Sequence, residues 1–171
     1  MTTLQTLADL LAPWQSAYSN SKTLSTGVTF AHLAGLLYGG GFAVAADRAA
    51  LRAAAGADDI RRRVLGELEA THRPVLIALT VSFASGVALV TADIATFWAS
   101  PVYWAKMGLI VLLLANGWVL RATERAAAVK SDAGDVVGEK ALWGRLKLTA
   151  WVSLVAWGSI VLAGVTLMGV A

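Results

Sequence analysis

Residues 148–171, LTAWVSLVAWGSIVLAGVTLMGVA, contain no charged side chain, and they decide the fold class of the chain. A helix needs about 20 mostly apolar residues to cross a bilayer core about 30 Å thick. Further runs at residues 25–46, 74–98 and 102–120 also meet this requirement, and none alternates between polar and apolar residues as a membrane β-strand does. The sequence therefore predicts an all-α fold: an integral membrane bundle of four transmembrane helices.

The composition of the 171-residue chain agrees with this prediction. Hydrophobic residues make up 57% and charged residues 15%, whereas soluble globular domains have about 25% charged residues. The net charge is only +3, so nucleic acid is not an expected partner. Because the chain has no cysteine, disulfides, thiolate nucleophiles and cysteine-ligated metal sites are excluded.

The N-terminal segment, residues 1–22, predicts a short amphipathic helix that lies in the membrane interface, outside the bundle of residues 23–171. Apolar side chains recur in it at helical spacing, and no basic stretch precedes them as it would in a cleaved signal peptide. These side chains are Leu4, Leu7, Leu10, Leu11, Trp14 and Tyr18.

The positions of lysine and arginine predict the orientation. The connections at residues 47–73 and 121–147 hold nearly all of them, whereas the N-terminal segment has only Lys22 and the turn at residues 99–101 has none. Basic connections stay in the cytoplasm, so we expect both termini on the non-cytoplasmic side of a bacterial inner membrane. The lipid bilayer is the expected partner, and other membrane subunits or a second copy of the chain remain open.

Three ionisable residues fall inside the predicted spans: His32, Asp93 and Lys106. At about 1.5 Å per residue, all three lie about 6–10 Å below the non-cytoplasmic boundary. Such groups are costly in lipid and usually face partners or cavities. Gly35 and Gly39 share a face with His32 and permit close helix approach. We therefore expect His32 to face inward, and Asp93 to pair with Lys106 across a short turn.

Each of these residues can also be explained by a purely structural role, without a bound ligand. Lys106 is near enough to the interface to extend its ammonium group into water, and Asp93 then serves only to neutralise it. His32 is a neutral core histidine, a haem or metal ligand, or a proton-transfer group. His72, beside Arg73 at the cytoplasmic end, is expected to be a solvated surface residue.

A haem held by both histidines is excluded. His32 lies about 21 Å of helix rise from the cytoplasmic boundary at which His72 lies, whereas two axial ligands approach within about 4 Å of each other. A haem b would therefore use His32 as the axial ligand of its iron. Lys106 or Met168 would be the second ligand, or Lys106 would bind a propionate while Asp93 sets its charge.

Two longer runs resemble known membrane proteins. Residues 30–52, FAHLAGLLYGGGFAVAADRAALR, are similar to the first helix of the copper-resistance-D-type membrane proteins, and residues 103–122, YWAKMGLIVLLLANGWVLRA, resemble their third helix. The second run also resembles the related haem-containing protoporphyrinogen oxidase of bacteria. The resemblance implies a four-helix membrane fold with a haem at a histidine and a lysine, and His32 and Lys106 are the matching positions.

The leading functional hypothesis is thus a membrane protein that binds haem b or a similar redox group near the non-cytoplasmic side, for electron transfer or oxidase-like chemistry. No phosphate-binding loop, nucleophile elbow or zinc-protease motif is present, so whether the chain is an enzyme stays open. One alternative is a cofactor-free accessory subunit of a respiratory or photosynthetic membrane complex. The other is a proton or metal-ion pathway through His32, Asp93 and Lys106.

Overall fold

The computed structural model describes residues 3–169, and helices account for nearly all of them. No strand occurs in this range, which confirms the predicted all-α class. In chain order the helices are α1 (Thr3–Asn20), α2 (Lys22–Ala54), α3 (Asp58–Ala92), α4 (Ile94–Ala99), α5 (Pro101–Asp132) and α6 (Val136–Met168).

Four of these helices, α2, α3, α5 and α6, are long and apolar enough to cross a membrane. A helix of 33 residues, such as α2 or α6, is about 50 Å long, well beyond the thickness of a bilayer core. Large apolar side chains lie exposed along these helices, where lipid suits them better than water. They include Phe30, Leu37, Phe83, Trp118, Val155 and Leu162. The chain is therefore a multi-pass membrane protein.

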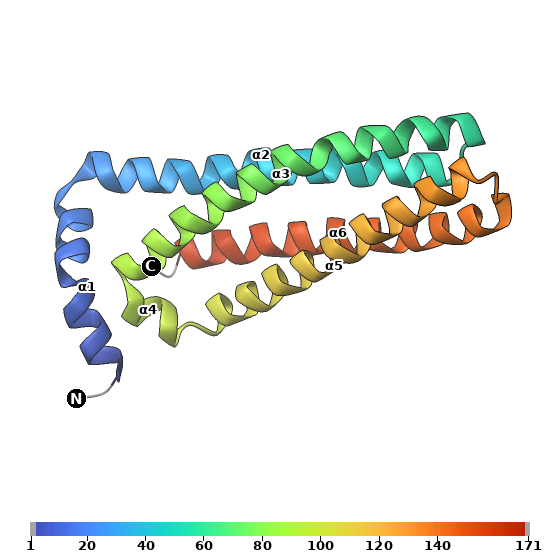
Figure 1. The fold of residues 1–171 in the computed structure, drawn as a ribbon. Coiled ribbons are helices and arrows are strands. Elements are labelled where there is room, and N and C mark those ends of the chain that lie inside the picture. Colours follow the sequence, from blue (N-terminus) through green and yellow to red (C-terminus); the bar gives the residue numbers. More distant parts are fainter. Residues whose placement is uncertain (1–2, 170–171) are drawn as a thin grey trace.

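The long helices form two antiparallel hairpins, α2–α3 and α5–α6 (Figure 1). The turns of both hairpins lie at one end of the bundle, which we call the hairpin end. Both chain termini and α4 lie at the other end, which we call the terminal end. The hairpins contact each other mainly through α2 and α6, whereas α3 and α5 touch much less.

Two glycines set the close packing of α2 on α3. A β carbon built on Gly35 would lie 2.8 Å from both the Ala78 carbonyl oxygen and the Ser82 backbone nitrogen. At Gly39 a β carbon would lie 3.2 Å from that of Ala78. The close approach predicted from the glycine spacing is confirmed, with α3 as the partner.

The apolar core consists of two separate clusters. One lies towards the hairpin end and contains Ala53, Leu65, Ala127, Trp143 and Leu146. The other contains Leu113, Ala156, Trp157 and Ile160. Helices α5 and α6 both contribute to the two clusters, and α6 supplies most of their buried side chains.

Helix α1 lies crosswise to the long helices at the terminal end (Figure 1). The Trp14 indole Nε1 donates a hydrogen bond to the Ala88 carbonyl at 3.1 Å, and Gln15 Nε2 donates to the Thr91 carbonyl at 3.3 Å. Thr91 belongs to the last turn of α3, whose carbonyls have no helical partner. The predicted N-terminal helix is present, and these bonds fix it against α3.

The second predicted span ends earlier than residue 98. The backbone leaves helical geometry at Asp93, which has φ −145° and ψ 64°, and the short helix α4 follows. The Asp93 carboxylate accepts a hydrogen bond from the Thr96 amide at 3.3 Å, as an N-cap residue does. Asp93 therefore stands at a helix break and not within a continuous helix.

The turn between α5 and α6 is fixed by Gly134 and Asp135. Gly134 has φ 71°, in the left-handed region that glycine adopts without strain. The Asp135 carboxylate accepts hydrogen bonds from Lys130 Nζ at 2.7 Å and from the Gly138 amide at 2.9 Å. These two donors, Lys130 first, hold the pKa of the partly exposed Asp135 carboxyl below its usual value.

Candidate functional site

His32 is half-buried and held by the backbone of α3. Its Nδ1 atom lies 2.8 Å from the Ser82 carbonyl oxygen, and the hydroxyls of Ser82 and Ser85 each lie 3.4 Å from the same atom. A carbonyl oxygen can only accept a hydrogen bond, so Nδ1 carries the proton and donates. In the neutral imidazole the other nitrogen, Nε2, then keeps its lone pair.

A glycine on α3 makes this arrangement possible. A β carbon built on Gly86 would lie 3.1 Å from Cε1 and 3.3 Å from Nδ1 of His32. The imidazole therefore rests where a larger residue would place a side chain. Since Gly35 brings the two backbones together one turn away, His32 meets α3 in a fixed orientation.

Lys106 approaches the same region from α5. Its Nζ atom lies 3.6 Å from a β carbon built on Gly164 of α6, and its charge acts on the His32 imidazole. Within residues 3–169 neither a hydrogen bond nor an ion pair involves the Lys106 ammonium group, and the only hydrogen bonds of His32 are those at Nδ1. The structure thus brings two of the predicted site residues near each other, each with an unused polar atom.

The other two predicted site residues are exposed, and in the described chain neither forms a hydrogen bond or an ion pair with His32 or Lys106. Asp93 is exposed, and its carboxylate caps α4. The predicted ion pair between Asp93 and Lys106 is not formed in the described part of the chain. Met168 is the last residue of α6 and is 66% exposed.

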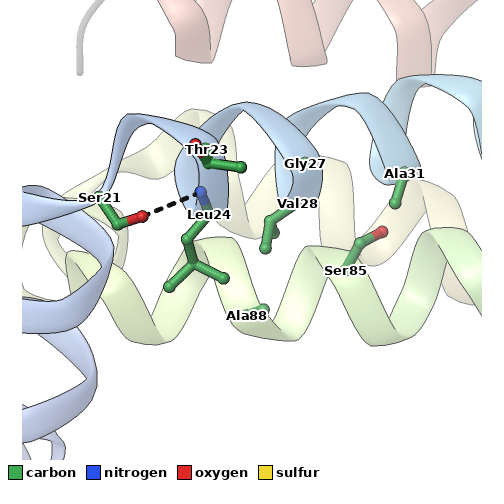
Figure 2. Close-up of a pocket in the computed structure, with 8 residues that line it drawn as sticks. All are labelled: Ser21, Thr23, Leu24, Gly27, Val28, Ala31, Ser85 and Ala88. Carbon is green, nitrogen blue, oxygen red and sulfur yellow. Dashed lines mark hydrogen bonds between the residues drawn. The ribbon is translucent and has the colours of Figure 1, made fainter.

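An open groove of about 510 Å³ runs between α2 and α3 at the terminal end (Figure 2). Small or apolar side chains line most of it, among them Val28 and Ala31 of α2 and Ala88 of α3. Ser85 lines this groove and also borders the His32 ring. The Ser21 hydroxyl is already engaged, since it accepts from the Leu24 amide at 3.3 Å. The groove thus adds apolar walls beside His32 but no ligating nitrogen.

A second polar region lies towards the hairpin end, in a cavity of about 280 Å³ that all four long helices line. Its apolar wall includes Leu79, Leu113 and Trp157, and Leu113 and Trp157 belong to the second core cluster. Its polar lining consists of Asp47, Thr71, His72, Arg121, Glu124 and Ser153.

His72 and Glu124 form the strongest polar contact of this cavity. His72 Nε2 lies 2.6 Å from Glu124 Oε2, and the two side chains are 23% and 8% exposed. The expectation that His72 is a solvated surface residue is therefore wrong. Helix α3 continues through Pro74 without a break, so His72 lies within a long helix and meets α5.

Asp47 is the most deeply buried acidic residue of the cavity, at 2% exposure. The Ser153 hydroxyl lies beside it, and the carboxyl groups of Asp47 and Glu124 are close enough to repel each other. Within the part of the chain that the structure describes, Asp47 Oδ2 and Glu124 Oε1 are buried without a hydrogen-bond partner. Buried acceptors usually have partners, so both atoms are exceptional.

Sequence reasoning missed this cavity, although a signal existed. Asp47, His72 and Glu124 all fall at or just beyond the same edge of the apolar runs, and hence at one level of the bundle. Each is followed by an arginine, and this pattern is typical of the solvated end of a transmembrane helix.

No protein family, curated protein or solved structure matches the chain. The geometry of the two polar regions is therefore the main guide to the function of the chain.

Proposed function

We propose that this membrane protein binds haem b, or a similar redox group, through His32 near its terminal end. The observation that supports this proposal is the orientation of the His32 ring, with Nδ1 held by the Ser82 carbonyl and Nε2 unused. Histidines that bind metals almost always donate their other ring N–H to a carbonyl, a carboxylate or water.

The residues around His32 fit such a group. An imidazole nitrogen is a common axial ligand of haem iron, and Lys106 offers an ammonium group without a partner in the described chain. A lone pair and a cation that are both unused in the described chain, and that interact electrostatically, suit a ligand that combines a metal with carboxylates. Haem b would supply one-electron transfer. Asp93 and Met168 have no part in this proposal because both are exposed and neither is bonded to His32 in the described chain.

The chain itself would position the group and limit access of water to it. The Ser82 carbonyl fixes the His32 ring, and Gly86 leaves room for it. Ser82 and Ser85 are themselves buried, so the anchor of the ring is shielded on the α3 side. A ligand nitrogen held in this way needs little reorganisation when it binds a metal.

The resemblance of residues 103–122 to the haem-containing protoporphyrinogen oxidase of bacteria supports the same proposal, and residues 30–52 resemble the related copper-resistance-D-type proteins. The proposal also includes the side of the membrane on which the group is bound. The lysines and arginines gathered at the hairpin end favour the cytoplasm for that end, and hence the non-cytoplasmic side of a bacterial inner membrane for His32.

An ion pathway through His32, Asp93 and Lys106 has less support, because Asp93 is exposed at the cap of α4. No specific contact favours a cofactor-free accessory subunit, which becomes an outcome of the test.

The proposal is tested by titrating the detergent-purified full chain with haem b and following the Soret band. We expect saturable binding in the wild type and in His72→Gln, and loss of the saturable Soret change in His32→Gln. Glutamine keeps a polar side chain of similar length at this position but has no imidazole nitrogen to bind the iron, and circular dichroism checks that the variant is folded. Equal binding by wild type and His32→Gln, or no binding by either, would contradict the proposal. In the latter case, co-purification with other membrane chains favours the accessory subunit.

A further inference from the structure

We infer that the cavity towards the hairpin end binds a small organic cation that carries a primary ammonium group. This inference does not depend on the proposed haem at His32, because it concerns other residues at the other end of the bundle.

The size and lining of the cavity suit a small molecule. Its volume of about 280 Å³ is close to the lower end of the usual range for ligand pockets, about 300–1,000 Å³. Such pockets combine apolar walls with a few placed polar groups. Here Leu79, Leu113 and Trp157 provide apolar walls, while Asp47 and Glu124 provide the polar groups.

The unpaired carboxylate oxygens select the charge of the ligand. Glu124 already faces His72, and the charge of Arg121, which also lines the cavity, acts on the same carboxylate. Among the described residues, Asp47 forms no ion pair with a cationic side chain. Asp47 is 2% exposed and Glu124 is 7% exposed, and each has one buried oxygen without a partner in the described chain. A buried carboxylate without a counter-ion is unfavourable. A bound cation would remove this cost at both oxygens.

The chemistry of the lining favours an ammonium over a metal ion. Among the residues described, no group of three histidine, aspartate or glutamate side chains is placed to hold a metal. A primary ammonium instead has three N–H donors and no acceptor. The free oxygens of Asp47 and Glu124, with the Ser153 hydroxyl beside Asp47, offer matching acceptors. The apolar wall then takes the alkyl part.

The ligand would enter between α3 and α5. Leu76 of α3 and Leu114 and Trp118 of α5 line the cavity and are more than half exposed, so they mark its mouth. These two helices contact each other little. Gly117 also lines the cavity, and a β carbon built on it meets no atom within 4 Å. A larger side chain at Gly117 can therefore occupy space that a ligand would use.

The test is isothermal titration calorimetry of the full chain in detergent with n-butylammonium chloride. Equal concentrations of n-butanol, which lacks the charge, and of sodium chloride, which lacks the N–H donors, serve as comparisons. We expect saturable binding of n-butylammonium only. Affinity should fall at least tenfold in Asp47→Asn, which keeps the shape of the side chain but removes its charge.

Two further variants make the result specific. Gly117→Leu should abolish binding by filling the cavity, without a change of charge. Glu139→Gln should bind as the wild type does, because the equally buried Glu139 lies outside the cavity and accepts from Trp143 Nε1 at 3.1 Å. His32→Gln should also bind normally, which separates this site from the proposed haem site.

Three results would overturn the inference. They are no saturable heat with n-butylammonium in the wild type, equal affinity in a folded Asp47→Asn variant, and equal binding of n-butanol or sodium. Proton uptake without ammonium binding counts as the first of these results.

Discussion

The two ends of the bundle bury opposite kinds of chemistry. Towards the terminal end, a histidine and a lysine lie half-buried, and His32 Nε2 and the Lys106 ammonium are unused in the described chain. Towards the hairpin end, Asp47 and Glu124 are almost fully buried, and only one of them faces a basic partner. The first region offers a nitrogen ligand and a cation, whereas the second offers carboxylates. Helices longer than the bilayer core can thus bury a second polar layer in addition to the one within the apolar spans.

An apolar layer separates the two regions. Leu113, Ala156, Trp157 and Ile160 pack between the hairpins on the terminal side of the cavity, with Leu36 and Leu109 against them. No hydrogen bond in the described chain links His32 with the residues of the cavity. The regions are therefore expected to respond to mutation independently.

The largest expected effect comes from His72→Ala. It leaves the Glu124 carboxylate buried without its partner at 2.6 Å, and breaking a buried pair costs about 3–5 kcal/mol. We expect a loss near 3 kcal/mol, because His72 is partly exposed and the Glu124 carboxyl can take up a proton. The free energy of unfolding in mixed detergent measures it. Lys106→Met is the counterpart at the other region and should change stability by no more than about 0.5 kcal/mol. Equal losses in the two variants would remove the distinction between the regions.

A substitution in the shared frame should disturb both regions. Gly35→Ala places a β carbon 2.8 Å from two backbone atoms of α3, so α2 and α3 must move apart. Overpacking of this kind costs about 1–3 kcal/mol. Gly41→Ala is the matched control, since a β carbon there meets nothing within 4 Å. Thermal unfolding followed by circular dichroism should show a clear drop for Gly35→Ala and no drop for Gly41→Ala. Similar melting temperatures would show that the close approach does not support the fold.

A smaller effect is expected where α1 docks on the terminal end. Trp14→Phe keeps an aromatic ring, although a smaller one, and removes the indole N–H that donates to the Ala88 carbonyl. A hydrogen bond of this type contributes about 0.5–1.5 kcal/mol. Hydrogen exchange of the α1 amides should become faster, while that of the α5–α6 turn stays the same. Unchanged exchange in α1 would mean that this bond does not hold the helix.

The smallest effect concerns pH at the hairpin end. Lys130 and the Gly138 amide hold the pKa of Asp135 below its usual value, so the stability it contributes is present above the unfolded-state pKa. That contribution is lost as pH falls through the lower folded-state pKa. A carboxyl titration of Asp135 by NMR should shift to higher pH in Lys130→Met. An unshifted titration would exclude Lys130 as the main cause.

The sequence predicts the fold class and the glycine contact well, because apolar runs and small-residue spacing are local signals. Uninterrupted runs locate the membrane helices, and Gly35 and Gly39 identify the face of α2 that packs closely. The inward position of His32 follows from the same face. These features need no knowledge of how distant segments align.

The remaining features depend on contacts that local patterns do not contain. The backbone turns at Asp93, so its carboxylate caps α4 and is not available to Lys106. The contact between His72 and Glu124 requires the relative axial placement of α3 and α5, which are separated by many residues. From the sequence alone, an ionisable residue followed by an arginine indicates a solvated helix end. This interpretation fails where the neighbouring helices continue beyond the level of that residue and bury it.

Binding of a redox group by the His32 nitrogen would be visible in the absorption spectrum of the protein purified from haem-replete cells. We predict a Soret band in the wild type and in Asp47→Asn, and none in His32→Gln. A wild-type protein without a Soret band, or a His32→Gln protein with the wild-type band, would contradict the account.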